Sequence, residues 1–159
     1  MTAVTTTDEQ PADPVMARIL VAVARSQSGD PAGARADFAA IWDEIGPAGD
    51  PFHRCVLAHH SADVQDDPRE ELAWDVHALQ AAREVRDARV KEHHASLSIE
   101  GFFPSLHLNL AEGYRRLGDV DDARRHVRAA RECLSALPDE GYGAMIRSGI
   151  DRVAALLDA

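Results

Sequence analysis

Histidine is the residue type in this sequence with the widest capacity for chemistry. The chain has 8 histidines, and a neutral imidazole can bind a metal ion or exchange a proton near neutral pH. His59 and Asp63 are four residues apart, and His53 and His60 are seven apart. In a helix, both spacings place the two side chains on one face. These four residues therefore form a candidate cluster of ligands.

A second group of histidines is His93, His94 and His107, which only the tertiary fold could bring together. A metal site requires three or four ligands that converge. The sequence has no HExxH motif and no paired CxxC motif, and Cys55 and Cys133 lie far apart in the sequence. We expect these histidines to be packed or capped, with no metal and no cofactor. A metal- or small-molecule-binding sensor that uses the His/Asp cluster of the second and third helix pairs is the alternative.

The sequence contains no glycine-rich phosphate-binding loop and no nucleophile elbow. We therefore predict that the chain is not an enzyme, and we assign no catalytic residue.

Acidic side chains are concentrated in one segment, which we call the acidic segment. It has six carboxylates in 13 residues, opposed only by Arg69: Asp63, Asp66, Asp67, Glu70, Glu71 and Asp75. Such a segment could be a docking surface for a basic partner, with salt-sensitive binding. It could also be a solvated turn followed by a helix start, where acidic residues favour the helix dipole. We favour the second interpretation.

Arginine is concentrated later in the chain. The members of this group are Arg115, Arg116, Arg124, Arg125, Arg128 and Arg131. Asp121 and Arg125 have i,i+4 spacing, as do Arg128 and Glu132, so we expect surface ion pairs within one helix.

Four Asp-Pro dipeptides predict where helices begin. Aspartate is a favoured N-cap, because its carboxylate accepts hydrogen bonds from the first-turn backbone N–H groups. Proline suits the next position, where its missing N–H costs nothing. The four dipeptides are Asp13-Pro14, Asp30-Pro31, Asp50-Pro51 and Asp67-Pro68.

Hydrophobic periodicity predicts an all-α fold. Apolar residues recur at helical spacing after each Asp-Pro, and Met16, Ile19, Leu20 and Val23 are one such set. No segment alternates long enough to predict a strand. Three more helices are expected, one from Pro104, one after Asp119 that carries Leu134 and Leu137, and one over 140–157. Residues 88–103 are expected to form an insertion with a short helix that ends at Gly101.

One helix pair carries a repeat-like motif. It reads Leu110-Ala111-x-x-Tyr114-x-x-x-Gly118-Asp119-x-x-x-Ala123-x-x-x-Val127-x-x-Ala130. Small residues at these positions allow two antiparallel helices to approach closely. The motif resembles the tetratricopeptide repeat (TPR). The first pair matches in the same register through Val21-Ala22, Gly29-Asp30, Ala34, Phe38 and Ile41. The second pair matches only at Ala78.

The resemblance implies a domain organisation. It predicts one domain over 14–157, and the composition of residues 1–13 predicts a disordered tail before it. Helix pairs over about 14–46, 51–87 and 104–137 would stack as a short right-handed superhelix, with 140–157 as the capping helix.

The resemblance also implies a binding role and a binding surface. The first helix of each pair would line a concave groove. The implied groove residues are His53, Val56, His60, Asp63, Ser105, Leu108, Asn109, Glu112, Arg115 and Arg116. Alternatively, several of them pack under residues 88–103 or against a partner subunit. We predict an adaptor or scaffold module for a protein or peptide, whose partner could present a basic segment.

Charge and hydropathy limit the other partners. The formal net charge is −10, which disfavours nucleic acid. No stretch has the length and hydrophobicity of a membrane span. The first residues lack the basic and apolar regions of a signal peptide, so a cytoplasmic location is expected. The sequence leaves open whether the chain forms a homo-oligomer.

Overall fold

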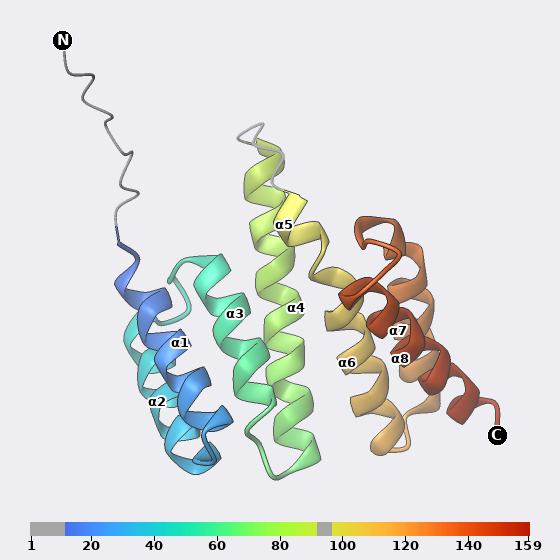
Figure 1. Cartoon of the computed structure of the whole chain (residues 1–159), viewed down its shortest axis with the longest axis horizontal. Helices are drawn as coiled ribbons and strands as arrows, with labels where there is room; N and C mark the ends of the chain where they lie inside the picture. The colour runs from blue at the N-terminus through green and yellow to red at the C-terminus, as the bar shows by residue number, and fades with distance from the viewer. Residues whose placement is uncertain (1–11, 92–96) are drawn as a thin grey trace.

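The computed structural model describes the backbone of residues 12–91 and 97–159, and the side chains of residues 12–88 and 99–159. Regular structure in these ranges is helical, and they contain no strand, which confirms the predicted all-α class. The elements in chain order are α1 (Pro14–Gln27), α2 (Pro31–Ile45), α3 (Pro51–Ala62), α4 (Pro68–Lys91), α5 (Leu97–Glu100), α6 (Phe103–Arg116), α7 (Val120–Glu132), a 3₁₀ turn (Leu134–Ala136) and α8 (Tyr142–Leu157) (Figure 1).

Aspartate caps begin all four helices that the Asp-Pro dipeptides predict. The Asp13 carboxylate accepts a hydrogen bond from the backbone N–H of Met16, the Asp30 carboxylate from that of Gly33, and the Asp50 carboxylate from that of Phe52. The Asp67 carboxylate accepts one from the backbone N–H of Arg69 at 2.8 Å. The predicted starts of α1 to α4 are therefore confirmed.

The first and third helical hairpins turn in the same way. Gly29 and Gly118 have φ values of 101° and 84°, a region that glycine adopts without steric cost. The next backbone N–H reaches back across each turn, from Asp30 to the Arg25 carbonyl and from Asp119 to the Tyr114 carbonyl. The two Gly-Asp dipeptides are therefore structurally equivalent, as the sequence register predicts.

Helices pack first as neighbouring hairpins and then against the next hairpin. The hairpins are α1–α2, α3–α4 and α6–α7. Helix α3 contacts both α1 and α2, α4 packs against α6, and α8 packs against both α6 and α7 (Figure 1).

Three hydrophobic clusters hold these contacts together. The first joins α1, α2 and α3, the second joins α3, α4 and α6, and the third joins α6, α7 and α8. Alanines that the sequence places at close crossings are all buried: Ala22, Ala34, Ala78, Ala111, Ala123 and Ala130.

Two predicted helix boundaries and one predicted buried position are wrong. Helix α4 continues to Lys91, so residues 88–91 extend that helix and do not open an insertion. The helix after Asp119 ends at Glu132, and the 3₁₀ turn bends the chain so that Leu137 is buried. Leu20 is 56% exposed, because Ile19 and Ala22 form the buried face of α1.

Some predictions fall on residues outside the described ranges. His93 and His94 are among these, and so is most of the expected tail over 1–13. Within the helices that are described, none has both the length and the hydrophobicity needed to cross a membrane.

Candidate functional site

The end of α3 brings together two histidines and an aspartate. His59 and His60 occupy the last turn of the helix, and Asp63 is its C-cap residue. The two imidazole rings lie edge to face, with centroids 5.0 Å apart. Nδ1 of His60 lies 3.9 Å from a carboxylate oxygen of Asp63. One ligand atom from each of the three residues lies within 4.8 Å of the others. We call these residues the His59–His60–Asp63 cluster.

The two histidines of this cluster are partly buried. Burial lowers the pKa of His60, and the neighbouring His59 lowers it further, although Asp63 acts in the opposite direction. Nδ1 of His59 is buried and has no hydrogen-bond partner. The lowered pKa of His60 favours its neutral imidazole, which is the form that binds metal ions.

A cavity of about 250 Å³ lies beside the cluster. It is formed where the ends of α1 and α3 approach α2, and His60 and Asp63 are part of its wall. The other lining residues are Val23, Ser26, Gln27, Phe38 and Val64. The cluster therefore adjoins a space that can admit water or a small group.

Two of the four groove residues predicted on α3 are engaged elsewhere. Nε2 of His53 lies 2.6 Å from the carboxylate of Asp13, so this histidine bridges to the start of α1. Val56 is 8% exposed and belongs to the first hydrophobic cluster. Only His60 and Asp63 lie together at the helix end.

On α6, two of the predicted groove residues pack inside the fold. Ser105 is 6% exposed, and its hydroxyl donates a hydrogen bond to the carbonyl of Phe102. Leu108 is half-buried against α8, where a Cβ added to Gly149 would collide with it.

The remaining predicted residues on α6 make polar contacts. Asn109 hydrogen-bonds to Asp75 of α4. Glu112 and Arg115 form a two-bond ion pair within α6. Arg116 reaches across to Glu71 of α4 at 2.8 Å. These contacts lie along the α4–α6 junction, so part of the implied groove is already occupied by internal pairs.

Asp75 differs from the rest of the acidic segment, because it is only 3% exposed. Burial raises the pKa of this carboxyl to about 7, and the charges of Glu71 and Asp63 add to the rise. One of its oxygens has no hydrogen-bond partner. Sequence reasoning placed Asp75 on a solvated face. The sequence signal of its burial is the helical spacing that places Asp75 three residues after Leu72 and four before Leu79, on the apolar side of the helix.

Four of the six carboxylates of the acidic segment have no arginine partner in the part of the chain that the structure describes, and one of these four is the buried Asp75. Asp66 pairs with Arg35 at 2.8 Å, and Glu71 pairs with Arg116. Among the described residues, no arginine pairs with Asp63, Asp67 or Glu70, and all three are exposed. Three carboxylates at the α3–α4 turn are therefore available to a partner.

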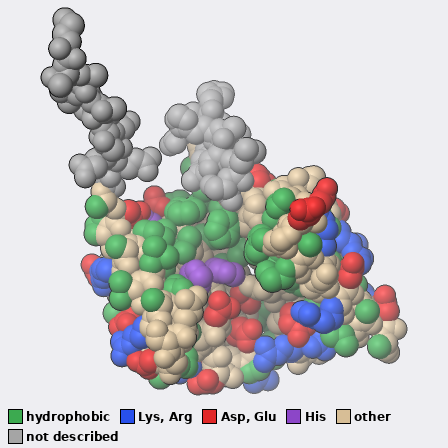
Figure 2. Space-filling model, in the orientation of Figure 1, with side chains coloured by type: hydrophobic (Ala, Val, Ile, Leu, Met, Phe, Trp, Pro, Cys, Tyr) green, Lys and Arg blue, Asp and Glu red, His purple; other side chains and the backbone are tan. Residues whose placement is uncertain are grey.

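Figure 2 shows one face of the molecule, coloured by the type of side chain. Histidine side chains gather near the middle of this face, over α3 and α4. Hydrophobic side chains lie above them and acidic side chains below them. The face therefore combines the three kinds of side chain that a peptide with both basic and apolar residues would contact.

A histidine pair between α6 and α7 was not anticipated. Nδ1 of His107 lies 3.0 Å from Nδ1 of His126, and Tyr114 stacks on His126. Burial, together with nearby charges, lowers the pKa of each histidine to about 4. The largest charge effect comes from His126 on His107 and from Arg125 on His126. The pair is therefore neutral at pH 7, with one ring donating to the other. The sequence predicted His107 near His93 and His94, which lie outside the described residues.

The arginine-rich part of the chain pairs differently from the prediction. Arg125 pairs with Asp122 one turn away, not with Asp121. Arg124 reaches Asp158, and Arg131 reaches Asp151, both beside or on α8. These arginines therefore attach α8 to α7.

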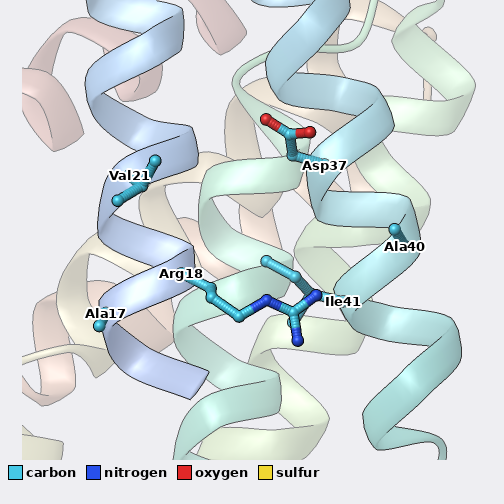
Figure 3. Close-up of a pocket in the computed structure, with 6 residues that line it drawn as sticks. All are labelled: Ala17, Arg18, Val21, Asp37, Ala40 and Ile41. Carbon is cyan, nitrogen blue, oxygen red and sulfur yellow. The ribbon is translucent and has the colours of Figure 1, made fainter. Parts of the chain in front are cut away.

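A second surface cavity, of about 360 Å³, lies on the outer side of the first hairpin. Figure 3 shows Ala17, Arg18 and Val21 from α1 on one side and Asp37, Ala40 and Ile41 from α2 on the other. Arg18 pairs with Glu44, and Asp37 with Arg25. The charged groups of this cavity are already paired, so it offers mainly apolar surface.

Comparison with protein-family models, with curated proteins and with solved structures found no match.

Proposed function

We propose that this protein is a TPR-like adaptor or scaffold module that binds a protein or peptide with a basic segment. The observation that carries the proposal is a set of three exposed carboxylates at the α3–α4 turn that no arginine of the described residues pairs with, namely Asp63, Asp67 and Glu70. Asp63 also lines the cavity beside α3.

The arrangement of the helices supports a repeat architecture. The turns at Gly29-Asp30 and Gly118-Asp119 have the same backbone hydrogen bonds. The first helix of each following hairpin, α3 or α6, packs against the second helix of the hairpin before it. Stacked helix pairs of this type serve as extended binding surfaces in repeat proteins.

Charge supports a basic partner. Residues 1–80 have 14 acidic and 5 basic side chains, a net charge of −9, and the unpaired carboxylates lie in this half. Arginine is the expected contact residue, because its guanidinium binds a carboxylate through two parallel hydrogen bonds. Exposed pairs each contribute little, so binding should be weak and should decrease with added salt.

A charge-removal variant tests this proposal. We expect the triple substitution D63N/D67N/E70Q to weaken binding of a fluorescent arginine- and lysine-rich peptide by about tenfold, measured by anisotropy at low salt. Asparagine remains a good N-cap at position 67, so α4 should still begin there.

An isocharged control separates this surface from the net charge. The triple substitution D43N/D121N/E132Q removes three exposed carboxylates from other parts of the molecule. We expect it to change affinity by less than about twofold. Equal losses in both variants, or no binding of the basic peptide by the unmodified protein, would contradict the proposal.

A further inference from the structure

We propose that His59, His60 and Asp63 form a binding site for one late first-row divalent metal ion, with zinc(II) as the expected occupant. The site is built from a single short stretch of chain, the last turn of α3 and its C-cap residue. This inference shares Asp63 with the peptide-binding proposal, but it rests on different observations and its test uses no peptide.

The three ligand atoms are slightly farther apart than in a site with a metal ion bound. The three ligand atoms already lie within 4.8 Å of one another. Zinc–ligand bonds of about 2.1 Å in a tetrahedron place ligand atoms about 3.4 Å apart. Small rotations of the side chains would bring the ligand atoms from their present separation to this distance. Asp63 is exposed, so its side chain is free to rotate toward the histidines.

An unsatisfied nitrogen is the second observation. Nδ1 of His59 is buried without a hydrogen-bond partner, a state that costs free energy in a folded protein. A metal ion bound at this nitrogen would provide the missing partner. The rings of His59 and His60 contact each other edge to face. This contact restricts both side chains, so the entropy that they lose on binding a metal ion should be small.

The surroundings favour a cation. The cluster lies at the C-terminal end of α3, where the helix dipole is negative. Asp66, Asp67 and Glu70 follow Asp63 within the next seven residues and add negative potential. The adjoining cavity of about 250 Å³ leaves room for the water or partner group that would complete the coordination.

The ligand types decide which metals fit. Two imidazoles and one carboxylate suit zinc, nickel and copper. Magnesium and calcium require a shell of oxygen ligands that this cluster does not provide. These two ions are therefore the chemical controls.

Calorimetric titration of the full chain, purified without a histidine tag and treated with chelator, tests the site. We expect one equivalent of zinc to bind and to raise the melting temperature, and magnesium and calcium to have no effect. Each of the substitutions H59Q, H60Q and D63N should weaken zinc binding at least tenfold. Circular dichroism of each variant checks that the helices are retained.

The other adjacent histidine pair in the sequence gives a matched control. The double substitution H93Q/H94Q removes two histidines outside the cluster, and H53Q removes one that pairs with Asp13. We expect both variants to bind zinc as the unmodified protein does. The proposal is overturned if no stoichiometric zinc binding occurs. It is also overturned if folded H59Q, H60Q and D63N retain full affinity, or if H93Q/H94Q loses as much affinity as they do.

Discussion

At the scale of single residues, burial changes the protonation of groups that look ordinary in the sequence. Asp75 has its pKa raised to about 7 by burial and by Glu71 and Asp63. His107 and His126 have theirs lowered to about 4 by burial and by nearby arginines. Both shifts favour uncharged groups in the interior, which is the usual outcome when charges lose water.

The two shifts have opposite effects on stability. The folded state binds an extra proton at Asp75 between pH 3.8 and about 7, so this group lowers the free energy of unfolding as the pH rises through that window. The unfolded state binds extra protons at the two histidines between about pH 4 and 6.5, so they lower stability as the pH falls through their window.

Replacing Asp75 by asparagine isolates the first effect. We expect D75N to raise the free energy of unfolding at pH 8 by on the order of 2 kcal/mol and to change it little near pH 4. Asparagine keeps a hydrogen-bonding group opposite Asn109 and has no charge to bury. Urea denaturation at pH 4, 6 and 8 measures the free energy of unfolding of D75N and of the unmodified protein. Both proteins contain the same histidines, so the histidine contribution cancels in the difference between them.

Substitution of an exposed aspartate provides the control. D43N on the outer face of α2 should leave the pH dependence of stability unchanged, because Asp43 is exposed. A D75N protein that is less stable than the unmodified one at pH 8 would show that the ionised carboxylate contributes favourably, contrary to our expectation.

At the scale of elements, local sequence signals determine helix starts and close crossings. Each predicted aspartate cap accepts its first-turn hydrogen bond, and the alanines of the repeat register are buried. Helix ends were predicted less well. Helix α4 extends to Lys91 and α7 stops at Glu132, and neither boundary has a glycine to indicate it.

Enlarging a buried alanine tests the close crossings. Ala34 lies on the side of α2 that packs against its neighbours and is fully buried, whereas Ala39 on the same helix is exposed. We expect A34L to lower the free energy of unfolding by about 1–3 kcal/mol, because extra methylenes have no space there. A39L should stay within about 0.5 kcal/mol of the unmodified protein. Equal stability of the two variants in urea denaturation would show that the crossing is not tight.

At the scale of the whole molecule, stability is distributed over three hydrophobic clusters rather than one core. The α1–α2 hairpin contacts the rest of the described structure mainly through α3. The α3–α4 and α6–α7 hairpins are joined by the extensive packing of α4 against α6. Terminal units of such stacked arrays lose structure at lower cost than central units.

Native-state hydrogen exchange should reveal this gradient. We expect backbone amides of α1 to exchange faster than those of α3, α4 and α6. The A34L variant should accelerate exchange in α1 and α2 and leave α7 and α8 unchanged, because the third hydrophobic cluster, to which α7 and α8 belong, shares no residue with the first. Uniform protection along the chain, or acceleration in α8 on introduction of A34L, would instead indicate a single cooperative unit.

The sequence by itself determined the all-α class, the helix starts and the equivalence of the first and third turns. Those features depend on interactions within a few residues: a carboxylate and the next backbone amides, a glycine φ angle, and the spacing of apolar side chains. Only the tertiary structure decided which polar groups are buried and which are paired. Asp75 meets Asn109, His107 meets His126 and Arg116 meets Glu71 because α4, α6 and α7 pack side by side. Such contacts join residues far apart in the chain, and their desolvation follows from packing that no local pattern encodes.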